Sequence, residues 1–361
     1  AGYRVGTYTS PHLIRYNERV RLDGVPVSDP ALCQAFARVE AARADTPLTY
    51  FEFGTLAAVE WFRASGCEIA LLEVGLGGRL DAVNAWDADA AIVTAIGIDH
   101  TEWLGTTRDS IAREKAGIFR PGRPAICADP DPPAALGEYA ERIGARLIRI
   151  GRDFDFERKT ADWLWRCGEE ARARLPYPAM RGDYQLYNAS AALMALHALG
   201  ERFPVTGTQV ASGLCGAVLP GRFQTLPGRP VRVLDVAHNA QAAHALAATL
   251  RQQTVAGSTI AVAAMLKDKP IAEVLGIMTA VVDRWHLASL PGVRGAPAAQ
   301  LAAAVQAAAP HAPVSVHDAV TDAYAAAVRA AAAADRIVVF GSFHTVGAIL
   351  RRVQQGEDDG G

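Results

Sequence analysis

Two nearly continuous apolar runs, Glu68 to Val74 and Ala88 to Ile96, restrict the possible folds of this chain most strongly. Each is bounded by Gly or Asp and lacks the alternation of a half-exposed strand. This pattern predicts strands buried on both faces of a parallel sheet. Amphipathic patterns predict helices over Pro30 to Arg43 and over Phe53 to Ser65. The alternation of predicted strands and helices over residues 1 to about 150 therefore indicates an α/β domain.

The same rhythm returns in the second half of the chain, after residues 151–176, whose alternation predicts an antiparallel excursion. Strands are predicted at Val231 to Val236, Thr259 to Ala264, Val282 to Leu287 and Arg336 to Phe340. They indicate a second, Rossmann-like unit. A chain of 361 residues exceeds the roughly 250–300 over which one core grows. We place the boundary near residues 218–228 and predict domains of 1–220 and 221–361.

Charge and composition restrict the classes of function. The chain has 36 basic and 38 acidic residues and no basic cluster, which gives no indication of a nucleic-acid or anionic-membrane partner. Its five cysteines are widely spaced and odd in number, which favours neither a disulfide framework nor a zinc cluster. No segment reads as a signal peptide or a membrane span. We expect a cytoplasmic protein with small-molecule ligands.

The two ends of the chain carry expectations of their own. Ala1-Gly2 resembles a helix end with its glycine cap, and Arg4 to Thr9 then reads as a strand. Because a natural start would carry Met, we expect a preceding helix and a chain that begins inside a βαβ unit. The tail from Gln354 is polar and is expected to fray.

Polar residues follow the predicted strands of the first half. Glu73 leaves one strand and enters a Gly-rich loop, and the next strand ends at Asp99-His100. Ligands of open parallel sheets bind where strands end, so these residues could supply oxygen and nitrogen ligands to a divalent cation. The plainer alternatives are a turn whose Glu is held by backbone amides and a helix cap.

Three further residues lie at predicted element ends in the first half. Ser10 and His12 follow the first strand, although Ser-Pro alone could be a turn. Lys115 lies in the last helical turn before Gly117, where a cation is an ordinary helix ending.

The second half repeats this arrangement. Asp235 to Asn239 and Gly341 to Thr345 each end a strand and open a helix, so they predict either helix caps or one side of a cleft between two domains.

Seven motifs occur together and in order. They are Thr9-Ser-Pro-His-Leu13, Glu73-Val-Gly-Leu-Gly-Gly-Arg-Leu-Asp81, Asp99-His100-Thr101, Arg113-Glu-Lys-Ala-Gly-Ile118, Leu219-Pro-Gly-Arg-Phe223, Asp235-Val-Ala-His-Asn239 and Gly341-Ser-Phe-His-Thr345. The set resembles the folylpolyglutamate synthase family, in particular bifunctional bacterial enzymes that also act as dihydrofolate synthase. The resemblance runs from residue 1 to about 350, with residues 151–182 matching only loosely.

The resemblance implies a Mur-ligase-like architecture, with an N-terminal P-loop ATPase domain and a C-terminal Rossmann-like domain around a cleft. It implies that ATP phosphorylates the carboxylate of dihydropteroate or a folate, and that L-glutamate then displaces the phosphate. A carboxylate does not react with amines until it has a leaving group, and Mg²⁺ can neutralise the phosphate charge. The family is usually monomeric.

The resemblance also implies roles for particular residues. Ser10 and Glu73 would ligate one Mg²⁺, and His100 a second. Lys115 would be carbamylated, which converts a cation into an oxygen ligand suited to Mg²⁺. The implied nucleotide-binding residues are Asn188, Arg222, Asp235 and His238, of which Arg222 and His238, with Lys115, would be catalytic. The implied substrate residues are His12, Tyr50 and Phe51 for the pterin and Ser342 and His344 for glutamate.

The sequence departs from the family pattern at one point. It contains no G-x-x-x-x-G-K-[ST] loop, which the family places upstream of the position where this chain begins. The chain as it stands is therefore expected to bind its ligands weakly and to turn over almost nothing.

Two alternatives stay open beside the folate enzyme. One is a cell-wall Mur ligase, which uses the same acyl-phosphate chemistry. The other is a non-catalytic nucleotide- or folate-binding protein, against which the predicted Mg²⁺ ligands at Ser10, Glu73, His100 and Lys115 argue. Dihydropteroate, tetrahydrofolate or both stay open as acceptors.

Overall fold

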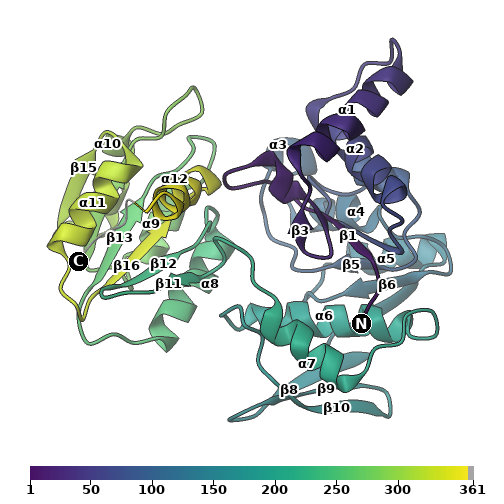
Figure 1. Cartoon of the computed structure of the whole chain (residues 1–361). Coiled ribbons are helices and arrows are strands. Elements are labelled where there is room, and N and C mark those ends of the chain that lie inside the picture. Colours follow the sequence, from purple (N-terminus) through teal and green to yellow (C-terminus); the bar gives the residue numbers. More distant parts are fainter. Residues whose placement is uncertain (357–361) are drawn as a thin grey trace. The chain divides into compact units, whose positions relative to one another are not determined.

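The chain divides into two compact units in the computed structural model, which describes residues 1–356 (Figure 1). Unit 1 comprises residues 1–178 and 186–216, and unit 2 comprises residues 179–185 and the chain from Ala217 onward. Both units are α/β, which confirms the predicted fold class. The predicted fraying of the tail beyond residue 356 lies outside the described residues.

Unit 1 contains three sheets among its described residues. The first has the order β3-β2-β1-β4, with β1 Val5–Tyr8, β2 Val20–Leu22, β3 Val25–Pro26 and β4 Ile69–Leu72. The second is parallel and contains β5 Ala91–Val93, β6 Pro124–Cys127 and β7 Arg146–Arg149. The third contains β8 Phe154–Arg158, β9 Trp163–Cys167 and β10 Glu170–Leu175. Its strands pair antiparallel, which confirms the predicted excursion.

Two expectations about the first sheet are wrong. The sheet is mixed, because β2 and β3 return antiparallel while only β1 and β4 run parallel. Strand β4 is not buried on both faces, since Leu71 is 58% exposed. Within residues 1–356 β4 pairs only with β1, and an apolar run does not report how many neighbours its strand has. In β5, Ala91 and Val93 are buried on one face, and Ile92 on the other face is partly buried.

Helices α1 and α2 of unit 1 begin at side-chain caps. Helix α1 (Asp29–Arg43) is capped by Ser28, whose side chain accepts from the Ala31 amide. Helix α2 (Tyr50–Ala64) begins three residues before the predicted start, because Thr49 and Glu52 form a reciprocal capping box. Tyr50 and Phe51 therefore lie in the first turn of α2.

The remaining elements of unit 1 are short connections and packing helices. Two 3₁₀ turns are η1 Tyr16–Arg19 and η2 Ala82–Ala85, and the other helices are α3 Thr101–Leu104, α4 Arg108–Ala116, α5 Ala134–Ile143, α6 Tyr184–Ala198 and α7 Gly207–Gly216. Buried clusters join these elements, for example Tyr8 of β1 with Phe62 of α2, and Ile111 of α4 with Leu136 of α5.

Unit 2 is built on a sheet of order β11-β12-β16-β13-β14-β15, as far as the described residues extend. The strands are β11 Gln224–Leu226, β12 Val231–Leu234, β13 Thr259–Ala263, β14 Arg284–Ala288, β15 Val314–His317 and β16 Arg336–Phe340. All pairs are parallel except β11 with β12. Every residue of β13 and β16 is buried, as expected for strands covered on both faces.

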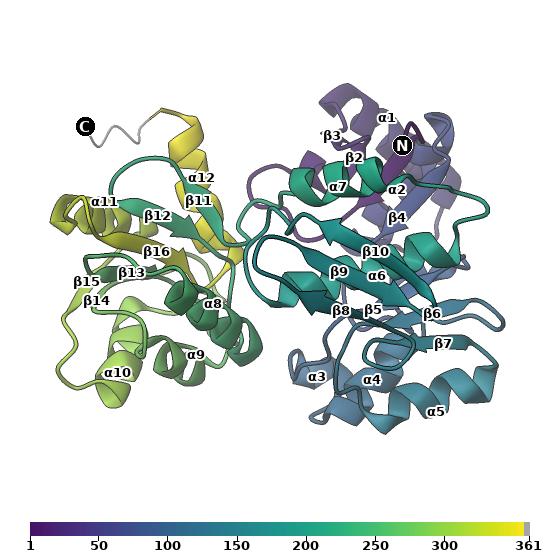
Figure 2. The same cartoon turned by 90° about the horizontal axis from the view of Figure 1, so that it is seen from below.

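Helices cover both faces of this sheet, α8 (Ala240–Gln252), α9 (Ile271–Met278) and α10 (Ala298–Ala308) on one face and α11 (Val320–Ala330) and α12 (Phe343–Gln354) on the other (Figure 2). This confirms the predicted Rossmann-like unit. None of the helices in the described part of the chain has the length and apolar character needed to cross a membrane.

Candidate active site

The first two predicted metal ligands meet at one sheet edge. The parallel pairing of β1 with β4 places Tyr8 opposite Leu72, so the residues that follow these strands emerge side by side. The Ser10 amide donates a hydrogen bond of 2.8 Å to Oε2 of Glu73. This contact brings Ser10, a residue with a hydroxyl group, next to the Glu73 carboxylate, and oxygen groups are the ligands that a hard cation prefers. It equally fits the plainer alternative of a Glu held by a backbone amide.

The Gly-rich loop after Glu73 packs on the end of α4. A β-carbon on Gly78, whose φ is +151°, would lie 2.9 Å from the carbonyl oxygen of Glu114 and 3.2 Å from that of Lys115. Arg79 fixes the contact, since its amide donates to the Glu114 carbonyl at 2.8 Å and its guanidinium pairs with the Glu114 carboxylate at 3.0 Å. A glycine is therefore required for the loop to approach the helix end that carries Lys115.

Lys115 is a partly buried amine beside an acid. Burial lowers the pKa of Lys115 below its ordinary value, and the negative charge of Asp99 opposes part of this shift. A lowered pKa increases the fraction of neutral amine, which is the form that carbamylation needs. A helix-ending cation does not require these surroundings.

Asp99 and His100 connect β5 to α3. His100 adopts the left-handed conformation (φ 51°, ψ 43°), and its side chain makes no capping hydrogen bond to α3. Its amide donates to Oδ1 of Asp99 at 2.8 Å. A left-handed residue with a β-carbon costs about 1–2 kcal/mol, so the local structure holds this segment in place.

The arrangement contains residues that can donate oxygen or nitrogen ligands to Mg²⁺, but it contains no cluster of three acidic, histidine or cysteine side chains among the described residues. The predicted set does not need such a group, because it combines Glu73 and His100 with a hydroxyl and a carbamylated lysine. Asp99 is a further oxygen donor on the Lys115 side. The strand-end pattern indicated it as a candidate ligand, whereas the set implied by the family resemblance does not include it.

Tyr50 and Phe51, both predicted to contact the pterin, have different environments. Phe51 lies 5.8 Å from Tyr8 between ring centroids, and a β-carbon on Gly75 would come within 2.5 Å of the Phe51 ring. Phe51 therefore packs on the Gly-rich loop after β4. Tyr50 is 66% exposed and instead borders a pocket.

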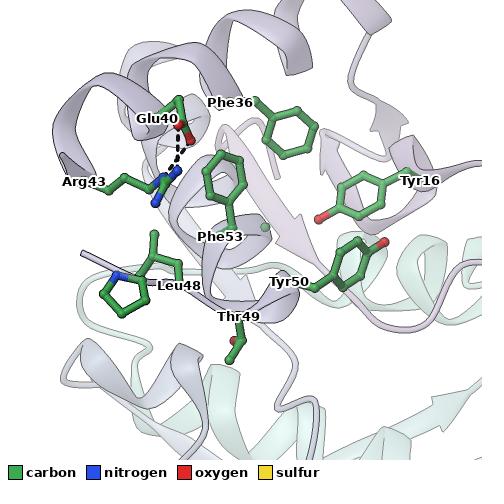
Figure 3. Close-up of a pocket in the computed structure, with 10 residues that line it drawn as sticks. Tyr16, Phe36, Glu40, Arg43, Leu48, Thr49, Tyr50 and Phe53 are labelled. Atoms are coloured by element: carbon green, nitrogen blue, oxygen red, sulfur yellow. Dashed lines mark hydrogen bonds and ion pairs between the residues drawn. The ribbon is translucent and has the colours of Figure 1, made fainter. Parts of the chain in front are cut away.

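This pocket lies between η1, α1 and the start of α2 and has a volume of about 630 Å³ (Figure 3). It is lined by Tyr16, Phe36, Glu40, Arg43, Pro47, Leu48, Thr49, Tyr50, Phe53 and Gly54. Its volume is in the range of small-molecule sites, and four aromatic rings form its walls. Glu40 and Arg43 form a bidentate ion pair on the side away from Tyr16 and Tyr50.

Arg19 is a residue that the sequence reasoning missed. Its side chain is buried, its guanidinium lies 5.4 and 5.8 Å from the ring centroids of Tyr16 and Tyr50, and its Nε donates to Nδ1 of His12 at 2.9 Å. Within residues 1–356 it forms no ion pair with a carboxylate. Buried charges are normally paired, so Arg19 is a candidate residue for contact with an anionic ligand. Its sequence neighbours give no such signal, because the burial is tertiary.

Three predicted nucleotide-binding residues lie together in unit 2. Burial raises the pKa of Asp235, although its carboxylate accepts from the amides of Phe223 and Ala237 at 2.9 and 2.8 Å and faces the charge of Arg222. His238 Nδ1 lies 2.8 Å from the carbonyl of Val236. The carbonyl can only accept, so Nδ1 carries a proton and donates it to this hydrogen bond.

Phe343 joins this cluster and was not predicted. The Arg222 guanidinium lies 5.5 Å from the centroid of its ring, and the His238 ring lies 6.2 Å away. The sequence reasoning chose its neighbours Ser342 and His344 instead. Ser342 is buried and its hydroxyl accepts from the Thr345 amide at 3.0 Å, which makes it the cap of α12. His344 is exposed.

Two asparagines singled out in the sequence, Asn239 and Asn188, lie in different units. Asn239 caps α8 by accepting from the Ala242 amide at 2.9 Å, as the capping alternative predicted. Asn188 lies in α6 within unit 1, whereas Arg222, Asp235 and His238 belong to unit 2. Their predicted gathering around one nucleotide stays a prediction.

Known proteins resemble this chain over nearly its whole length. Residues 221–343 match the family described as Mur ligase, glutamate ligase domain. Dihydrofolate synthase/folylpolyglutamate synthase of Escherichia coli (strain K12) is 43% identical over 350 residues, which are 97% of this chain and 80% of the relative. The Haemophilus influenzae enzyme of the same name is 37% identical over 363 residues, 96% of this chain and 82% of the relative.

Solved structures agree with these relatives. E. coli FolC in complex with DHPP and ADP has a TM-score of 0.94 and 42% identity, covering 99% of this chain and 84% of that chain. The bifunctional folylpolyglutamate synthase/dihydrofolate synthase with Mn, AMPPNP and L-glutamate bound has a TM-score of 0.91 and 43% identity, covering 98% and 84%. The chain therefore belongs to the dihydrofolate synthase/folylpolyglutamate synthase family of the Mur ligase superfamily.

Proposed function

We propose that this chain belongs to an ATP-dependent ligase that joins L-glutamate to dihydropteroate, to folates or to both through an acyl phosphate. The observation that carries the proposal is the junction in unit 1, where Glu73 bonds to the Ser10 amide and the following glycine loop packs on the helix end with Lys115. The relatives' structures with DHPP, ADP, AMPPNP and L-glutamate support the same reaction.

The metal site takes two Mg²⁺ ions in this proposal. Ser10 and Glu73 hold the first, and His100 with carbamylated Lys115 holds the second. When bound, the ions supply positive charge that offsets the charge of the phosphates. The lowered pKa of Lys115 supports carbamylation, because the neutral amine reacts with carbon dioxide.

The acceptor binds in unit 1. Phe51 and Tyr50 offer aromatic surface to a pterin, and Arg19, next to His12, offers a buried cation to a negatively charged group of the substrate. The lack of a paired carboxylate at Arg19 supports this assignment, since a charge-assisted hydrogen bond to a ligand would compensate its burial.

The nucleotide and glutamate engage unit 2 as well. Arg222, Asp235 and His238 contact the nucleotide, and Asn188 of unit 1 contacts adenine. Arg222 and His238, with Lys115, are the catalytic residues in this proposal. Residues 1–220 form the ATP-binding domain and residues 221–361 the glutamate-ligase domain, which the match over residues 221–343 supports. The protein is cytoplasmic and monomeric.

The deciding experiment measures the products of ATP. The whole gene product is assayed, because the relatives are longer than the matched region. With dihydropteroate and L-glutamate we expect release of ADP and phosphate that depends on both substrates. Stoichiometric AMP would place the protein in an adenylating class and overturn the mechanism. Activity on nucleotide-linked muramyl acids alone would favour the cell-wall ligase.

A further inference from the structure

The segment between β5 and α3 has no regular structure, yet it carries Asp99 and His100. Ile96, in the middle of this segment, is 2% exposed. Its amide donates to Oδ2 of Asp129 at 2.8 Å, and its carbonyl accepts from Nε of Arg108 at 2.9 Å. A buried loop backbone needs hydrogen-bond partners, and here two charged side chains supply them from two other elements.

These two side chains also bind each other. Nη2 of Arg108 lies 3.2 Å from Oδ2 of Asp129, which is 5% exposed. The second oxygen of Asp129 accepts from the Asp131 amide at 2.9 Å, and Nη2 of Arg108 donates to the Asp131 carbonyl at 2.7 Å. Hydrogen bonds of Arg108 and Asp129 thus hold together the loop, the start of α4 and the residues after β6. Hydrogen bonds of charged groups are the strong ones.

These hydrogen bonds connect two predicted parts of the metal site. Arg108 is the first residue of α4 and Lys115 lies near its end, so the helix transmits the position of one to the other. Asp99 follows Ile96 by three residues and acts electrostatically on Lys115.

We propose that Arg108 and Asp129 are positioning residues. Their hydrogen bonds to the carbonyl and the amide of Ile96 fix the position of the Asp99-His100 segment relative to Lys115. The inference rests on the proposed function, since it concerns the second metal ion. A purely stabilising role for the pair is the competing explanation. It predicts a lower unfolding temperature for variants of the pair with unchanged metal binding.

The test compares three variants of the whole gene product. Asp129→Asn keeps the shape but leaves a single oxygen for the amides of Ile96 and Asp131. Arg108→Lys keeps the charge and loses the fork that reaches both Ile96 and Asp129. The control is Asp131→Asn, because the Asp131 side chain is 93% exposed and its ion pair with Arg108, at 3.2 Å, does not involve Ile96.

Three quantities are measured: Mn²⁺ affinity by electron paramagnetic resonance, amide exchange of residues 94–101 by mass spectrometry, and unfolding temperature. Asp129→Asn and Arg108→Lys should each weaken Mn²⁺ binding roughly tenfold or more and speed the local exchange, because each breaks charge-assisted bonds. Asp131→Asn should stay within about twofold of the unsubstituted protein.

Unchanged Mn²⁺ affinity in both variants would overturn the positioning role, whatever happens to the unfolding temperature. If Asp129→Asn does not fold, Arg108→Lys alone decides, since the Arg108 side chain is 39% exposed and its replacement is tolerated more easily. No Mn²⁺ binding by the unsubstituted protein would overturn the proposed metal site itself and this inference with it.

Discussion

Replacing Arg19 with Met should separate substrate binding from stability. The guanidinium is buried against the rings of Tyr16 and Tyr50, and within residues 1–356 no carboxylate pairs with it. A hydrogen bond from a charged group to a ligand contributes about 1.5–3 kcal/mol. Its loss corresponds to roughly a 10- to 150-fold weaker affinity for an anionic acceptor, at 1.4 kcal/mol for each factor of ten.

The same substitution should change the free energy of unfolding little. Met gives up the hydrogen bond to His12, about 1 kcal/mol, and two ring contacts of about 1 kcal/mol each. It also removes the desolvation penalty of a buried charge that has no carboxylate partner, which is on the order of several kcal/mol. These contributions nearly cancel, so the net change should lie within about 2 kcal/mol of zero.

Two measurements on the whole gene product decide: dihydropteroate binding by fluorescence quenching, and thermal unfolding. The matched control is Arg15→Met, which removes the same charge nearby from an exposed pair with Asp29. It should leave binding unchanged and cost less than about 1 kcal/mol. The reasoning about Arg19 fails if Arg19→Met binds dihydropteroate normally, above all if it also unfolds at a much lower temperature.

Three further predictions concern single residues. Lys115→Arg keeps a cation at the helix end but cannot be carbamylated, so ligase activity should fall heavily, and near-normal activity would refute the ligand role. Phe343→Leu should lower kcat/KM of the whole gene product about tenfold, since the flat ring that packs against Arg222 and His238 is lost, whereas Phe343→Tyr should keep most of it; equal loss in both variants would contradict this. Burial, then the charges of His317, Arg284 and Arg329, lower the pKa of His286. The folded state therefore binds fewer protons than the unfolded state, and the free energy of unfolding should fall as pH drops from about 7 to 5. Denaturant titrations should show this slope flattened in His286→Gln, and an unchanged slope would exclude His286 as its source.

Much of the fold followed from local pattern, and its errors have identifiable causes. The strands β13 and β16 were predicted because all their residues are buried, which makes the apolar run itself informative. Strand β4 has a similar run but an exposed Leu71, since its surroundings depend on partners that the run does not encode. The start of α2 was missed because the capping pair Thr49 and Glu52 received no weight against the apolar pattern.

The residues of the candidate site also differ in whether local sequence pattern could predict them. Ser10, Glu73 and Lys115 end regular elements, so their positions follow once the strands and helices are known. Arg19 and Phe343 gain their significance only from tertiary contacts: an arginine is ordinarily exposed, and a phenylalanine after a strand ordinarily belongs to the core. Conversely, Ser342 resembles a ligand in sequence but serves as a helix cap.

Burial favours the neutral form of several ionisable groups around the unit 1 site. It lowers the pKa of Lys115 and raises the pKa values of Asp81 and Tyr16. Each shift favours the neutral form, so these surroundings disfavour uncompensated charge. A neutral lysine is what carbamylation requires, and a divalent cation with phosphates interacts more strongly where water is excluded. The low polarity that shifts these pKa values would therefore also strengthen the binding of the ions that the reaction needs. Hence we expect a substitution that admits water beside Lys115 to weaken metal binding and carbamylation together.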